Sequence, residues 1–347
     1  MTLILLALLT ATAAAETLPA CWTPSDLAQR KGEEVVQKGV KQARIAPPQR
    51  TLADNSPIPQ RGAVRRVKLP AGQKLVALTF DLCEQPFEIS GYQGGMVDFL
   101  RQNQVKATFF MGGKWMLSHR DRAQQVMTDP LFEVANHSWE HRNLRTLSGK
   151  ALVDEIKNAQ LAYEQVRDEL EAKQCTRPGG TTVASEQAPK RLGLIRFPYG
   201  ACSAAALNEV AQQGLLPIQW DVSAGDPTFG VSARMIERQV LANVQPGSIV
   251  LFHANGRGWH TAGALPGIIA TLKGQGYAFV TVSELIAAGE PVMTTTCYDS
   301  RPGDTDRWPL RRPVPVSGLF GLPANGAGGA LSSPWPPTPR ATASGAR

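Results

Sequence analysis

Short apolar runs alternate with segments of helical periodicity from Lys74 to Val282, and this alternation limits the possible folds more than any other feature. Strands that alternate with helices are typical of parallel βα units. The sequence therefore predicts an α/β fold, either a barrel or a doubly wound sheet. The predicted strands cover residues 75–80, 107–111, 131–135, 192–197, 217–222, 248–252 and 278–282.

The clearest helical pattern follows Ser148, a good N-cap residue. Apolar residues recur there at alternating steps of four and three, from Leu152 to Leu170, as on one face of a helix. A further helix is predicted near the N-terminus, over residues 25–42. Within the alternating region, other helices are predicted over residues 203–213, 232–244 and 262–273.

Chemically useful side chains follow the predicted strands. In a (β/α) barrel, catalytic residues lie at the carboxyl ends of strands. Asp81, His137, Arg196 and His253 occupy such positions, as does Asp221, which could equally be a structural hydrogen-bond acceptor. These residues are the first candidates for a functional site.

His137 and His141 are four residues apart in a chain that holds 5 histidines. On one helical turn this spacing would point both imidazoles the same way, as two ligands of a zinc-like ion require. Two unrelated histidines would show the same spacing, so the rest of the site must decide.

The 347 residues allow one large domain or two ordinary ones. Residues 1–15 have the apolar run and small residues of a secretory signal peptide, and no later segment is long enough to span a bilayer. We expect an N-terminal extension and linker over residues 16–73, the main domain over 74–290, and a C-terminal extension over 291–347 that is largely disordered from 313. The protein should be exported, to the periplasm or the extracellular space.

The formal charge is +7, but the basic residues are spread out and are not interleaved with aromatic side chains. We therefore expect no nucleic-acid partner, and at most a weak attraction to anionic cell-envelope polymer. The 5 cysteines fit an oxidising compartment with one or two disulfides. Cys21 and Cys297 flank the main domain and could join its ends, although neither the connectivity nor the oligomeric state follows from sequence.

Five short motifs occur in order at the strand ends. Together they resemble the signatures of the polysaccharide deacetylase family, the NodB-homology domain of carbohydrate esterase family 4, and the resemblance covers residues 74 to about 286. The motifs are Thr79-Phe80-Asp81, His137-Ser138-Trp139-Glu140-His141, Arg196-Phe197-Pro198-Tyr199-Gly200, Trp220-Asp221 to Asp226, and Leu251-Phe252-His253.

The resemblance implies a distorted (β/α) barrel that performs metal-assisted hydrolysis of an N-acetyl, or less often an O-acetyl, group. The expected substrate is a cell-envelope or amino-sugar polymer such as peptidoglycan. His137 and His141 would hold a divalent metal, with Zn²⁺ as the expected ion. Asp81 would be the general base, and Arg196 would keep its carboxylate ionised.

The same resemblance assigns the remaining roles. The backbone N–H of Tyr199 would complete the oxyanion site. His253 would protonate the leaving amine, oriented by Asp226. Leu251 would line the pocket for the acetyl methyl, and Pro198 and Trp220, with Tyr199, would contact the substrate.

The chain departs from the family pattern at two positions. The family's third metal ligand is an aspartate at the position of Leu82, and its aromatic partner to Asp226 is replaced by Pro227. If the chain stays extended past Asp81, residues 82 and 84 project to the same side, so Glu84 is predicted to supply the missing ligand. Two alternatives remain open. Glu84 could be a surface residue with no role in the site, and the metal could be held by the two histidines and water alone.

Two other functions stay possible at this point. The motif His137 to His141 also spells H-x-x-E-H, the pattern of inverted zinc metalloproteases, in which Glu140 would be the base. Alternatively, the chain is a degenerate barrel that binds glycan without hydrolysis, with Leu82 as the mark of lost activity.

Overall fold

The structure, a computed structural model, describes residues 21–41, 44–52, 56–173 and 188–310. The predicted signal peptide and the tail from residue 313 lie outside the described residues. None of the described helices is both long and apolar enough to cross a bilayer.

Strand β3 (Leu75–Leu82) lies at the centre of a parallel sheet and is buried along almost its whole length. It pairs with β5 (Ala107–Met111) on one side and β10 (Ile249–His253) on the other. Its uninterrupted apolar sequence is typical of a strand that is covered on both faces. Phe80 stacks between Phe109 and Phe252, with ring centroids 5.3 and 5.4 Å apart, and so ties the three strands together.

The sheet has the strand order β8-β7-β6-β5-β3-β10-β9, and β11 pairs with the start of β3. Every pairing in it is parallel, and no ladder joins β8 to β9 within the described residues, so the barrel is open. The predicted α/β fold of a distorted (β/α) barrel is confirmed. The remaining strands are β6 (Phe132–Asn136), β7 (Leu194–Ile195), β8 (Leu216–Pro217), β9 (Val222–Ser223) and β11 (Ala278–Phe279).

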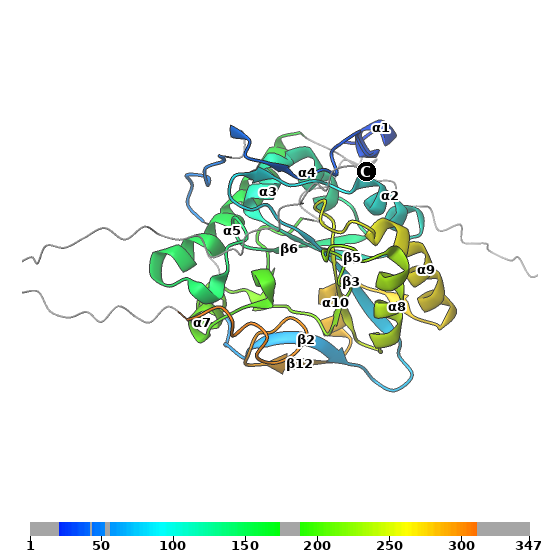
Figure 1. Cartoon of the computed structure of the whole chain (residues 1–347). Coiled ribbons are helices and arrows are strands. Elements are labelled where there is room, and N and C mark those ends of the chain that lie inside the picture. The colour runs from blue at the N-terminus through cyan, green and yellow to red at the C-terminus, as the bar shows by residue number, and fades with distance from the viewer. Residues whose placement is uncertain (1–20, 42–43, 53–55, 174–187, 311–347) are drawn as a thin grey trace, which may run out of the picture. The chain divides into compact units, whose positions relative to one another are not determined.

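Helices cover the sheet in groups, with α3, α4 and α5 together in one region and α8 and α9 together in another (Figure 1). Helix α5 (Gly149–Ala172) begins after Ser148, as predicted, and buries the apolar stripe from Leu152 to Leu170. The side chains of Ser203 and Ser232 cap α7 and α8. The other helices are α2 (Gly94–Gln102), α3 (Gly113–Ser118), α4 (Arg120–Met127), α7 (Ala204–Gln212), α8 (Ala233–Asn243), α9 (Thr261–Gly274) and α10 (Val282–Ala287).

Two small antiparallel sheets accompany the main one. β1 (Gln37–Lys38) pairs with β4 (Glu88–Ile89), and β2 (Ala63–Lys68) pairs with β12 (Glu290–Thr294). The second pair joins residues on both sides of the boundaries expected at 73 and 290. β2, from the expected N-terminal extension, and β12, which runs into the expected C-terminal extension, therefore form one sheet.

The helix predicted over residues 25–42 is wrong, because only α1 (Pro24–Leu27) is α-helical there. The reason is a tertiary contact. The buried Arg122 guanidinium donates to the backbone carbonyls of Asp26, Leu27 and Ala28 and to the Glu33 carboxylate. These hydrogen bonds hold the segment against α4, where Arg122 lies, and its carbonyls accept from Arg122 instead of from a continuing helix.

A disulfide joins Cys202 to Cys297, so Cys297 does not form the bond with Cys21 that the sequence left possible. The bond connects the loop after the third motif to the segment that follows β12. Cys21 is also disulfide-bonded, whereas Cys83 is a buried free thiol.

Candidate active site

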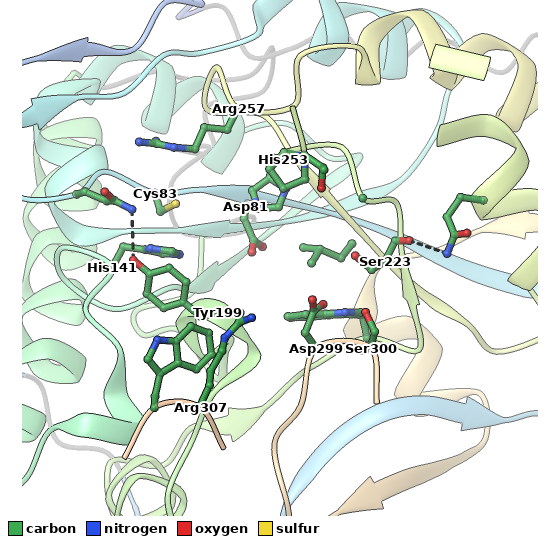
Figure 2. A pocket seen from close by; sticks show the side chains of 18 residues that line it. Asp81, Cys83, His141, Tyr199, Ser223, His253, Arg257, Asp299, Ser300 and Arg307 are labelled. Carbon is green, nitrogen blue, oxygen red and sulfur yellow. Dashed lines mark hydrogen bonds between the residues drawn. The ribbon is translucent and has the colours of Figure 1, made fainter. Parts of the chain in front are cut away.

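Asp81 and His253 lie side by side at the carboxyl edge of the sheet. They are direct partners in the parallel pairing of β3 with β10, so the sheet register alone brings the expected base and acid together. Both side chains line a cleft of about 500 Å³, a volume suited to a sugar-sized ligand (Figure 2).

Asp81 is 4% exposed and is held by Arg196, which is fully buried. The Arg196 Nη1 donates to the Asp81 Oδ1 at 2.8 Å, and the guanidinium lies over the Phe110 ring, 3.9 Å from its centroid. Burial opposes ionisation of Asp81, but the Arg196 guanidinium holds the pKa of its carboxyl below the ordinary value. Asp81 is therefore a carboxylate at neutral pH, as a general base must be.

His253 forms a second buried pair with Asp226. The His253 Nδ1 lies 2.9 Å from the Asp226 Oδ1, while the Asp226 Oδ2 accepts from the His253 backbone N–H and from the Thr261 hydroxyl. Burial lowers the pKa of His253, but the Asp226 carboxylate outweighs this and raises it above the ordinary value. Gly258 allows the close packing here, because a Cβ on it would lie 2.8 Å from the Asp226 Oδ2 and 2.2 Å from the His253 carbonyl oxygen.

His137 and His141 do converge, but not on a helical turn as expected. Residues 137–141 form a non-helical loop after β6, with positive φ at Ser138 (64°) and His141 (59°). Positive φ at a non-glycine residue costs roughly 1–3 kcal/mol, and such strained residues cluster at functional sites. The two imidazole centroids are 5.0 Å apart.

The ring nitrogens of the two histidines are prepared for a cation. The His137 Nδ1 lies 3.0 Å from the Arg196 carbonyl oxygen, which can only accept, so the proton is on Nδ1 and Nε2 carries a lone pair. The His141 Nδ1 is buried without a hydrogen-bond partner among the described residues, and the buried His137 Nε2 makes no hydrogen bond there but lies 3.3 Å from the Asp81 Oδ2. Burial lowers the pKa of both side chains, which keeps them neutral. This donor set fits a divalent metal ion.

Glu84 does not join the two histidines, contrary to prediction. Its Oε2 accepts from the Ser118 hydroxyl at 2.8 Å and from the Ser90 N–H at 3.1 Å, and its Oε1 lies 3.7 Å from the Lys114 Nζ. Residues 82 and 84 do share one side of the extended chain, but that side faces the core, where Leu82 is fully buried. Burial raises the pKa of Glu84 to about 7.

The cysteine between them faces the cleft instead. Cys83 lies on the same side of the chain as Asp81, and one potential ligand atom each from Cys83, His137 and His141 lie within 4.8 Å of one another. The prediction passed over Cys83 because the family's third ligand is a carboxylate.

The predicted substrate contacts are mostly in the cleft. Leu251, Trp220 and Tyr199 line it, whereas Pro198 is buried and does not. Tyr199 has a left-handed backbone (φ 61°), and its ring packs edge-on against His141 with centroids 4.5 Å apart. The oxyanion role of the Tyr199 N–H remains a prediction.

One wall of the cleft comes from a segment that sequence reasoning assigned to the C-terminal extension. Residues 298–308 follow the disulfide at Cys297, and the Arg65 guanidinium anchors them by donating to the carbonyls of Tyr298 and Asp299. The Trp308 ring lies 5.6 Å from that of Tyr199. The further lining residues that the sequence analysis missed are Gln85, Ser223, Thr228, Gln239, Arg257, Asp299, Ser300 and Arg307.

The metalloprotease alternative loses its structural basis. It requires both histidines on a helix, and residues 137–141 form a non-helical loop instead. Glu140 is not among the described residues that line the cleft.

Fold and site together define an open (β/α) barrel with two buried acid–base pairs and a histidine-rich corner at the carboxyl edge of its sheet. A family model described as polysaccharide deacetylase matches residues 68–218. A peptidoglycan-N-acetylglucosamine deacetylase of Bacillus cereus is 32% identical over 219 residues, which is 62% of this chain and 70% of that protein. The chain belongs to the polysaccharide deacetylase family.

Other relatives show how far the likeness extends. The peptidoglycan-N-acetylglucosamine deacetylase PgdA of Listeria monocytogenes is 30% identical over 228 residues, or 66% of this chain, but the match spans only 42% of that protein. The crystal structure of the Bc1960 peptidoglycan N-acetylglucosamine deacetylase aligns with a TM-score of 0.53 and 25% identity, covering 66% of this chain and 94% of that one. A mutant of BA3943, named as a CE4 family pseudoenzyme with restored activity, aligns with a TM-score of 0.51 and 25% identity over 64% of this chain and 70% of that one.

Proposed function

We propose that this chain is an exported, metal-dependent deacetylase that hydrolyses N-acetyl groups of an amino-sugar polymer of the cell envelope, with O-acetyl groups as the alternative. The proposal rests on two buried ion pairs that lie side by side in one cleft. Asp81 pairs with Arg196, and His253 pairs with Asp226. A glycan binder needs neither a base nor an acid, whereas amide hydrolysis needs both.

The chemistry follows from the charge state of each group. Asp81, ionised beside Arg196, accepts a proton from the water that attacks the acetyl carbonyl carbon. His253, protonated beside Asp226, donates a proton to the nitrogen as the C–N bond breaks. The products are acetate and a free amine.

A divalent cation, Zn²⁺ by preference, would be held by His137 and His141 and would polarise the carbonyl and acidify the attacking water. The Tyr199 N–H would stabilise the oxyanion, and Leu251 would pack against the acetyl methyl. Trp220 and Trp308 would pack against the sugar ring. Trp308 would take the place of the family's aromatic residue, which is Pro227 in this chain.

Export is supported by the predicted signal peptide and by the disulfide between Cys202 and Cys297, since disulfides persist in oxidising compartments. Peptidoglycan is the favoured polymer because the relatives above are named for it.

Acetate release from chitin oligomers, peptidoglycan fragments and acetylated xylan tests the proposal. The wild-type protein with Zn²⁺ should release acetate from at least one amino-sugar substrate, and His253→Ala should reduce the rate by about 100-fold or more. The proposal fails if the protein binds these glycans and releases no acetate. That outcome would identify a degenerate glycan-binding barrel.

A further inference from the structure

Cys83, the residue after β3, places a thiol beside His137 and His141 at the edge of the cleft. Because side chains alternate along an extended chain, Asp81 and Cys83 share one side while Leu82 points into the core. Cys83 is 3% exposed and is not in a disulfide. Figure 2 shows Cys83 among the side chains that line the cleft, above His141 in this view.

The geometry of the three side chains is that of an incomplete metal site. One ring nitrogen each from His137 and His141 lies within 4.8 Å of the Cys83 Sγ and of the other, and the His137 Nε2 and His141 Nδ1 are buried without a hydrogen bond among the described residues. Tetrahedral Zn²⁺ with two nitrogen ligands and one sulfur ligand separates the ligand atoms by roughly 3.3–3.6 Å. The observed bound of 4.8 Å exceeds this spacing, so metal binding would draw the three ligand atoms closer together.

The surroundings of the sulfur suit a thiolate ligand. The Asn255 Nδ2 donates to the Cys83 Sγ at 3.2 Å and to the Cys83 carbonyl oxygen at 2.9 Å, which fixes the residue from behind. Asn255 is itself fully buried. Groups that hydrogen-bond to a metal ligand without touching the metal hold that ligand in its orientation, and the Asn255 amide could hold the Cys83 sulfur in this way. Burial raises the pKa of the free thiol, and a coordinated divalent ion reverses this by displacing the proton to solvent.

We propose that Cys83 is the third protein ligand of the metal, so that the site is His137–His141–Cys83 where the family pattern has two histidines and an aspartate. The inference rests on the metal dependence of the proposed function. It predicts a thiophilic site that selects Zn²⁺ and Co²⁺ over Mg²⁺ and Ca²⁺, because thiolate prefers softer ions. Three protein ligands would leave a fourth coordination position for water or substrate, as in catalytic zinc sites.

Cobalt spectroscopy of the full-length protein tests this directly. Co²⁺ bound to the wild-type protein should give a thiolate-to-cobalt charge-transfer band in the near ultraviolet. Cys83→Ser should lose the band and bind Zn²⁺ at least about tenfold more weakly in a chelator competition. Cys83→Asp should bind Zn²⁺ without the band. Glu84→Gln, the neighbouring carboxylate, is the matched control and should keep both the band and the affinity.

The outcomes separate this inference from the proposed function. A wild-type protein that binds Co²⁺ without the band, binds no metal, or loses no Zn²⁺ affinity on Cys83→Ser would overturn the thiolate ligand, even if acetate is released. The band without any acetate release would support the ligand and contradict the deacetylase. Far-ultraviolet circular dichroism and thermal melting establish that each variant is folded.

Discussion

The two sides of the cleft relate differently to the family pattern. On the proton-transfer side, Asp81 and His253 each stand at a strand end, and each has a buried partner, Arg196 and Asp226. All four residues match the family signatures, and each lies in the contact that its expected role requires. A side chain fixed by both the sheet register and an ion pair has little freedom to lie elsewhere.

The histidine–cysteine side, made of His137, His141 and Cys83, keeps two of the expected ligands and departs at the third. Leu82 is buried in the core, and the next side chain that faces the cleft is a thiol. The comparison shows that a ligand atom need not come from the residue that the family motif predicts. A neighbouring residue can offer one if its side chain lies on the side of the strand that faces the cleft. Different chemistry at the metal with unchanged acid–base chemistry is the expected consequence.

The largest effect is expected on the proton-transfer side. Asp81→Asn keeps the shape of the side chain but removes the base, so kcat should fall by about 100-fold or more. Asp154→Asn, a change in a surface carboxylate of α5 that pairs with Lys150 and does not line the cleft, is the matched control and should leave kcat unchanged. Steady-state kinetics of acetate release measure both, and equal rates for Asp81→Asn and wild type would remove Asp81 from the mechanism.

A change in pH dependence is expected from Asp226→Asn. His253 must be protonated to act as the acid, and the Asp226 carboxylate raises its pKa, so activity falls as pH rises through that raised value. Removing the carboxylate lowers the pKa of His253, and the alkaline limb of the kcat profile should move to lower pH by about one unit. An alkaline limb that stays in place would show that another group sets it.

A smaller effect is expected at the wall formed by residues 298–308. Trp308→Ala removes the ring beside Tyr199 but touches neither acid–base pair, so KM should rise several-fold with little change in kcat. Leu310→Ala, an exposed neighbour outside the cleft lining, is the control. An unchanged KM would mean that the sugar does not contact this wall.

The smallest effect is expected from Glu84→Gln, which sharpens the comparison between the two sides of the chain after β3. Glu84 faces Ser118 and Lys114, away from the histidines, so Zn²⁺ stoichiometry and affinity should equal those of the wild type. A sharp loss of bound zinc in this variant, measured by elemental analysis, would restore Glu84 as the ligand.

Sequence could predict those features that depend on local pattern. Buried parallel strands show continuous apolar runs, so the positions of Asp81, His137, Arg196 and His253 at strand ends followed directly. Side-chain direction after Asp81 was harder, because extended geometry says that residues 82 and 84 share a side but not which side faces the cleft. Only the packing of Leu82 into the core decides that.

Features that depend on distant contacts were out of reach. The wall that contains Trp308 is held by the disulfide from Cys202 to Cys297 and by Arg65, far away in the sequence. The turn near α1 depends in the same way on Arg122. In both cases tertiary contacts override or escape local propensity.

Acetate formation in water enriched in oxygen-18 tests the central claim most directly. The protein, loaded with Zn²⁺ and mixed in excess with N-acetylated peptidoglycan fragments, should release acetate that carries one solvent oxygen, together with an equal amount of free amine. This result is predicted because, in the proposed mechanism, water attacks the carbonyl while Asp81 and His253 transfer protons. Intact substrate, or acetate without new amine, from a protein that holds its metal would contradict N-deacetylation by this site.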